Sequence, residues 1–258
     1  MNDARFAGAF LFRPRSWRRV LRFGGVAIVA AISPSTYNAQ AREVAVRQIY
    51  YTAWQVLPGY CAAAALLSLF LIELVAQFAH KYGISAYSLE LVLNVLVLEL
   101  VPVLTALFVA LRSGAAIGAE VALLAVSGEM EEAGASNPLH AELVPRIAGA
   151  ALSVASLTTL GCLVAVVLCY TSFYGFNNAG AAEFTRIVAN VFGGPELASF
   201  LFKCLLFGLA VAIIPAATAL EAERGVMRSL PAVVLGGLVK LFFAILVIET
   251  AALVVKDA

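Results

Sequence analysis

The sequence is poor in charged side chains. Only 13% of its residues are Asp, Glu, Lys or Arg, and 62% are hydrophobic, whereas a soluble domain is about 25% charged and about 45–50% apolar. So few polar side chains could not cover a surface that faces water, and the sequence therefore predicts an integral membrane protein. The net charge of +1 indicates nothing about partners, and we expect no nucleic-acid partner.

The residues that usually form metal or catalytic sites are also scarce. The four cysteines, Cys61, Cys162, Cys169 and Cys204, lie in apolar runs without CxxC spacing, so buried free thiols are expected rather than disulfides or a metal site. His80 and His140 are far apart in the sequence. No GxxxxGK[ST] phosphate loop is present. We therefore expect neither an enzyme nor a nucleotide site of the P-loop kind.

Five apolar runs are each long enough to cross a bilayer as a helix. They cover about 57–79, 87–111, 146–172, 197–220 and 230–255. The predicted fold is an all-α membrane protein in one domain, 1–258. It divides into N-terminal interfacial helices (1–54) and a five-span bundle (55–258). A polar segment (112–144) joins spans two and three, and a Gly- and Asn-rich loop (173–196) joins spans three and four.

The N-terminal region, rich in arginine, allows two interpretations. Six arginines precede a short apolar run, 23–32. Ten helical residues rise only about 15 Å, half of the hydrocarbon core. A signal peptide with a small-x-small site at Ala39-Gln40-Ala41 is one interpretation, and a helix that lies in the membrane interface is the other. We favour the interfacial helix.

The basic residues predict the orientation of the spans. Twelve of the seventeen Lys and Arg residues fall on the side of the N-terminus and of the polar segment, and only Lys81, Arg186 and Lys256 fall on the other side. The N-terminus and the polar segment are therefore expected in the cytoplasm. Loop 173–196 and the C-terminus are expected on the opposite, periplasmic side.

Ionisable residues inside the apolar runs are the first candidates for function, because a charge inside a bilayer needs protein or water around it. Glu99 lies near the middle of span two, three residues before Pro102. A proline there removes a backbone donor and clashes with the carbonyl of Leu98, so a kink is expected. A polar cavity is one interpretation, and a packing hydrogen bond from Glu99 to Asn94, Thr105 or another span is the alternative. Glu73, Lys203 and Glu249 lie closer to span ends, where snorkelling would explain them.

The stretch 99–146 resembles the MlaE/YrbE family of ABC-transporter permeases. The resemblance rests on Glu99-Leu100, on Pro102 to Leu107, on Arg112-Ser113-Gly114, on Ala119-Glu120 and on Leu143 to Arg146. An upstream match covers Arg47 to Tyr50, Thr52, Gln55 and Leu57-Pro58. The sequence departs from the family pattern at Leu98, where the family has arginine, and at Val101, where it has glycine.

The resemblance implies the permease subunit of a transporter that moves phospholipid or a related lipid between the inner and outer bacterial membranes. It implies a homodimer, a separate cytoplasmic ABC ATPase that supplies ATP and Mg, a periplasmic MCE-domain protein and a small STAS-domain protein. A non-transporting membrane scaffold or a small channel is the alternative. A channel would need a continuous polar stripe along a span, and the sequence has only isolated charges.

Two sets of residues are the predicted sites of such a permease. A lipid cavity is expected at Glu99, Pro102, Asn94 and Gln77. Coupling to the ATPase is expected through a short helix in the polar segment, with the residues Arg112, Gly114, Glu120, Glu129, Glu131, Glu132 and Arg146.

Overall fold

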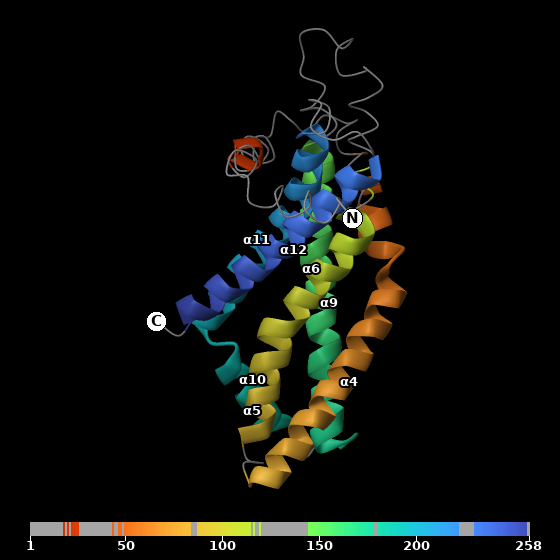
Figure 1. The fold of residues 1–258 in the computed structure, drawn as a ribbon. Helices are drawn as coiled ribbons and strands as arrows, with labels where there is room; N and C mark the ends of the chain where they lie inside the picture. The colour runs from red at the N-terminus through yellow and green to blue at the C-terminus, as the bar shows by residue number, and fades with distance from the viewer. Residues whose placement is uncertain are drawn as a thin grey trace, which may run out of the picture.

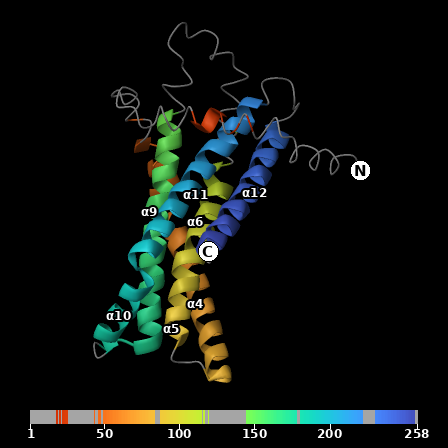
Figure 2. The same cartoon turned by 90° about the vertical axis from the view of Figure 1, so that its left-hand side faces the viewer.

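The long helices of the protein form one elongated bundle (Figures 1 and 2). The computed structural model describes residues 50–83, 87–114, 144–177, 180–221 and 230–256, with isolated positions before Tyr50 and after Gly114. Within these ranges every regular element is a helix. Most of the predicted interfacial region at the N-terminus and most of the polar segment lie outside the described residues.

Five helical stretches are long and apolar enough to cross a membrane, which confirms the predicted five-span fold. They are Leu57–Tyr82, Ser88–Arg112, Ile147–Tyr174, Gly194–Thr218 and Val234–Val254. The corresponding elements are α4 (Leu57–Tyr82), the compound helix of span two, α9 (Val144–Tyr174), α11 (Gly194–Glu221) and α12 (Leu230–Lys256).

Glycines end two of the spans. Gly83 has φ 73° and caps α4, and Gly175 has φ 68° directly after α9. Left-handed backbone of this kind favours glycine because it has no Cβ. The amide of Gly83 donates to the carbonyls of Ala79 and His80, so the last turn of span one keeps its hydrogen bonds.

Span two changes helix type along its length. It starts as α5 (Ser88–Val92), continues as the π-helix η4 (Leu93–Leu100), returns to α-helix in α6 (Val101–Val109) and ends in a π turn, η5 (Ala110–Gly114). Pro102 stands in the first turn of α6, directly after the π-helix η4, so its missing amide hydrogen removes a donor from a continuous helix. The sequence predicts a kink at Pro102, and the structure places a π-helical segment directly before it.

The Gly- and Asn-rich loop predicted at 173–196 contains a helix, α10 (Ala181–Val191), which the sequence analysis does not predict. The glycines that suggested a loop stand on either side of this helix, and 181–191 has neither glycine nor proline. Phe184 and Val191 are buried, and the ring of Phe184 packs edge-on against Tyr170 at 5.1 Å. α10 lies at one end of the bundle, beside α5 (Figure 1).

The buried apolar residues form two clusters, one in each half of the bundle. One cluster includes Tyr60, Ala106, Phe207 and Leu241. The other includes Leu93, Leu96, Val101 and Phe184, toward α10. Span two contributes to both clusters, and its contribution changes from one to the other between Val101 and Ala106.

Tyr60 connects spans one, two and three in the first cluster. Its ring is fully buried, and its hydroxyl lies 2.6 Å from the Thr105 hydroxyl. The Thr105 hydroxyl donates to the carbonyl of Val101 at 2.8 Å, so Tyr60 is the donor in the first bond. Gly161 of α9 makes room for this contact, because a Cβ there would stand 2.1 Å from the Tyr60 hydroxyl oxygen.

We predict that Gly161→Ala lowers the stability of the protein by about 1–3 kcal/mol, the usual cost of overpacking a core. Adding Tyr60→Phe should recover part of the loss, because the next ring atom is 3.1 Å from the added carbon. Thermal unfolding in detergent measures both changes. Gly59→Ala is the control, since a Cβ at Gly59 meets nothing within 4 Å. Equal stability of Gly161→Ala and Gly59→Ala would contradict the packing described.

Candidate functional site

Three ionisable side chains from three different spans meet inside the bundle. Lys203 of α11 is only 4% exposed and lies between Glu99 of span two and Glu249 of α12, each 17% exposed. The Lys203 ammonium pairs with Glu99 Oε2, and it lies 2.9 Å from Glu249 Oε1 and 2.8 Å from Glu249 Oε2. We call these three residues the charge cluster.

The charge cluster is the arrangement that makes a lysine tolerable inside a span. Removing an ammonium group from water is expensive unless opposite charges and hydrogen bonds replace the water. Two carboxylates supply that replacement here. Spans two, four and five are therefore held at one point by electrostatic attraction as well as by apolar packing.

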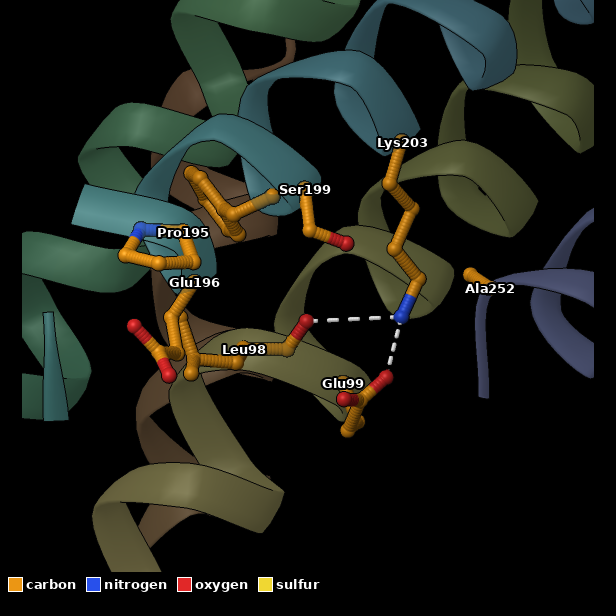
Figure 3. Close-up of a pocket in the computed structure, with 8 residues that line it drawn as sticks. Leu98, Glu99, Pro195, Glu196, Ser199, Lys203 and Ala252 are labelled. Carbon is orange, nitrogen blue, oxygen red and sulfur yellow. Dashed lines mark hydrogen bonds and ion pairs between the residues drawn. The ribbon is translucent and has the colours of Figure 1, made fainter. Parts of the chain in front are cut away.

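Pro102 adds a further acceptor for Lys203. A residue with an N–H at position 102 would donate to the carbonyl of Leu98 in an α-helix, and proline cannot. Lys203 Nζ lies 3.4 Å from that carbonyl oxygen, as the dashed line in Figure 3 shows. The proline in span two thus frees a backbone oxygen, and a lysine from span four takes it.

A cavity of about 270 Å³ opens beside the charge cluster. Polar and apolar side chains line it together (Figure 3). The lining residues are Leu98, Glu99, Pro195, Glu196, Ser199, Phe200, Lys203 and Ala252. A cavity whose wall is charged on one part and apolar on another suits an amphiphilic molecule better than a purely apolar or an inorganic one.

Of the four residues predicted to form a cavity, Glu99 is the one that lines it. Pro102 is buried in the next helical turn. The Asn94 side chain donates to the carbonyl of Glu90 at 3.2 Å, and Gln77 is exposed on α4. Neither residue lines this cavity. Thr105, another predicted alternative for a bond to Glu99, is bonded to Tyr60, and the partner from another span is Lys203 of α11.

The prediction that snorkelling accounts for Lys203 and Glu249 is wrong. Both side chains turn inward and pair with each other in the charge cluster. Distance from a span end was the misleading criterion, because it ignores which face of the helix carries the charge. One signal could have revealed the charge cluster. A lysine lies in one apolar run and glutamates lie in two others, and these charges can neutralise one another.

Two of the residues predicted to couple to the ATPase lie at the end of span two. Arg112 is exposed. Gly114 is buried, and a Cβ there would stand 3.4 Å from Pro215 Cγ of α11 and 3.5 Å from Leu241 Cδ2 of α12. The start of the polar segment therefore touches spans four and five directly. Glu120, Glu129, Glu131 and Glu132 lie outside the described residues, as does the side chain of Arg146.

The fold and the site define a multi-pass membrane protein with a charged cavity inside its bundle. The family Permease MlaE matches residues 45–255, and the chain belongs to that family. It is also 29% identical over 154 residues to a protein of Synechocystis sp. named as a probable ABC transporter permease, an alignment that covers 57% of each chain. The chain thus spans a little over half of the length of that relative, and its family and its five apolar helices are those of a membrane permease.

We predict that Lys203→Met destabilises the protein by about 3–5 kcal/mol, because it leaves two buried carboxylates without their cation. Adding Glu99→Gln and Glu249→Gln should restore most of that loss, since no buried charge then remains in the charge cluster. Lys81→Met, at an exposed position near the end of α4, serves as the control. Thermal unfolding of the purified protein provides the comparison, and a Lys203→Met variant as stable as Lys81→Met would show that the charge cluster does not hold the bundle.

Proposed function

We propose that this permease moves phospholipid, or a lipid related to it, between the inner and outer membranes of a bacterium. The observation that carries the proposal is the cavity in which Glu99, Glu196 and Lys203 stand beside Leu98, Phe200 and Ala252. A lipid headgroup finds charged partners there, while its acyl chains have apolar surface beside them. At about 270 Å³, the cavity is slightly smaller than a typical small-molecule pocket of about 300–1,000 Å³. It fits a headgroup, with the chains outside it.

The permease acts, in this proposal, as a homodimer in the inner membrane. Its N-terminus and the polar segment face the cytoplasm, and its C-terminus faces the periplasm. The long apolar faces of α4 and α12, with exposed residues such as Phe70, Phe78, Phe242 and Phe243, offer surface to lipid or to a second copy. An MCE-domain protein on the periplasmic side and a STAS-domain protein beside the ATPase complete the assembly. These features rest on the family resemblance.

Energy enters through the polar segment in this mechanism. The partner ATPase binds ATP and Mg and pushes on residues of about 115–135. The push reaches the bundle through Gly114, which packs on Pro215 and Leu241. Spans four and five also carry Lys203 and Glu249, so a movement at Gly114 changes the charge cluster. Lipid is released when the carboxylates and the ammonium separate and pair again.

Charge reversal of Glu129, Glu131 and Glu132 should uncouple the ATPase, because the partner would lose the acidic face on which it is expected to dock. Liposomes that contain the purified complex allow ATP hydrolysis and lipid transfer to be measured together. We expect hydrolysis to continue and lipid transfer to fall toward the level without ATP. Charge reversal of Glu183 in α10 and Glu90 in α5, both exposed and outside the cavity, is the control for charge alone. Unchanged transfer by the triple variant would place the docking site elsewhere.

Mass spectrometry of the purified complex tests the cargo directly. Phospholipid should copurify with the wild-type complex, and Ser199→Trp, which fills the cavity and keeps all three residues of the charge cluster, should reduce it. A complex that carries no lipid, or equal lipid in both variants, would contradict the proposed cargo site.

A further inference from the structure

The π-helical segment of span two, Leu93–Leu100, separates two parts of the same span that belong to different cores. Upstream of it, and within it, Leu89, Val92, Leu93 and Leu96 pack in the cluster near α10. Downstream, Ala106, Val109 and Ala110 pack in the cluster around Tyr60. A change of helix type inside the segment would therefore turn Leu89 and Val92 relative to Ala106 and Val109, and it would repack the cluster near α10.

A π-helical stretch holds more residues per turn than an α-helix does. Such stretches are rare in proteins, and those that occur are often found at functional sites. A change of this segment to α-helix would alter the number of residues in each turn. For each residue by which the register changes, the residues before the segment would rotate by about 100° about the axis of span two and shift by about 1.5 Å along it. Glu99 stands inside the segment, at its C-terminal end. Its orientation toward Lys203 therefore depends on the helix type of this segment.

The backbone at the end of the segment is held by side chains from other spans. Pro102 has no N–H, so it can donate neither to Leu98, as an α-helix requires, nor to Val97, as a π-helix requires. Lys203 Nζ of α11 lies 3.4 Å from the Leu98 oxygen, and Cys162 Sγ of α9 lies 3.8 Å from the Val97 oxygen. Neither helix type gains a backbone hydrogen bond from position 102, so the proline itself favours neither. The side chains of Lys203 and Cys162 favour the π-helix that is observed.

We propose that the segment Leu93–Leu100 is a register joint. Span two passes between π- and α-helix there during the transport cycle, and the change turns Glu99 away from Lys203. The joint directly precedes α6, and Glu99 stands at the end of the joint nearest to α6. A push at Gly114 therefore reaches both Glu99 and the joint through α6, which Tyr60 and Thr105 hold to span one. This inference rests on the proposed function, since it describes how the cavity of the transporter is controlled.

The distance across the joint tests the inference. Spin labels at Leu91 and Leu111 flank the segment at exposed positions (44% and 70%), and labels at Leu152 and Leu163 of α9 (57% and 60% exposed) form a control pair within one α-helix. The native cysteines are replaced, with Cys162→Ser to keep a donor. In the full complex with its ATPase, we expect the Leu91–Leu111 distance to change by several ångström between the nucleotide-free and nucleotide-trapped states, with the control distance unchanged.

Deletion of Val95, which is 45% exposed, provides a second test, because it removes one of the extra residues that the π-helical turns hold. The deletion should fix a single Leu91–Leu111 distance in both states and reduce lipid transfer by about tenfold or more, within the usual range of coupling energies. Val95→Ala, which keeps the chain length, should behave as wild type. If the deletion prevents folding, the distances in the full-length protein decide alone.

The outcomes separate the two proposals. A Leu91–Leu111 distance that is the same in both nucleotide states, or full lipid transfer by the deletion variant, overturns the register joint and leaves the proposed function standing. A wild-type complex that hydrolyses ATP and moves no lipid overturns the proposed function, and the distance measurement still decides whether the joint exists.

Discussion

The structure depends on one ammonium group that lies between two carboxylates in an apolar bundle. Lys203 of span four pairs with Glu99 of span two and with Glu249 of span five. Burying any one of the three charges without its partners would cost more free energy than the packing around it provides. The attraction fixes the relative position of spans two, four and five more specifically than apolar packing does, because apolar contacts tolerate sliding and a charged pair at hydrogen-bond distance does not. The cavity beside the charge cluster is therefore charged on one side, and small movements of the three helices change its shape and charge.

The same constraint connects the backbone to the charges. Pro102 withdraws a hydrogen-bond donor from span two, and the carbonyl of Leu98 that loses its partner lies within reach of Lys203. The π-helical segment Leu93–Leu100 ends at this place. Helix type, proline and lysine therefore form one arrangement, in which a change in any of them alters what the others can bind. Gly114, at the end of span two that we propose faces the cytoplasm, packs against Pro215 of span four and Leu241 of span five. A movement of Gly114 would therefore also move these two spans.

The sequence predicts the fold well, because membrane spans are set by length and hydropathy alone. Glu99 could also be singled out, since a carboxylate in the middle of an apolar run has few explanations. Its partners could not, because pairing depends on which faces of three helices meet, and periodicity within one span does not fix that. The helix α10 was missed for a related reason. Glycines beside a segment suggest a loop, but Phe184 finds a place against Tyr170 only when the chain is folded.

The central claim is that lipid enters the cavity beside the charge cluster, and photo-crosslinking tests it most directly. A photoreactive amino acid at Ser199, which lines the cavity, is compared with one at Leu201, which is 59% exposed on the outside of the same helix. In the complex with its ATPase, we predict that Ser199 captures phospholipid in one nucleotide state and loses it in the other, while Leu201 captures lipid equally in both. Capture at Leu201 with none at Ser199 in any state would contradict the account.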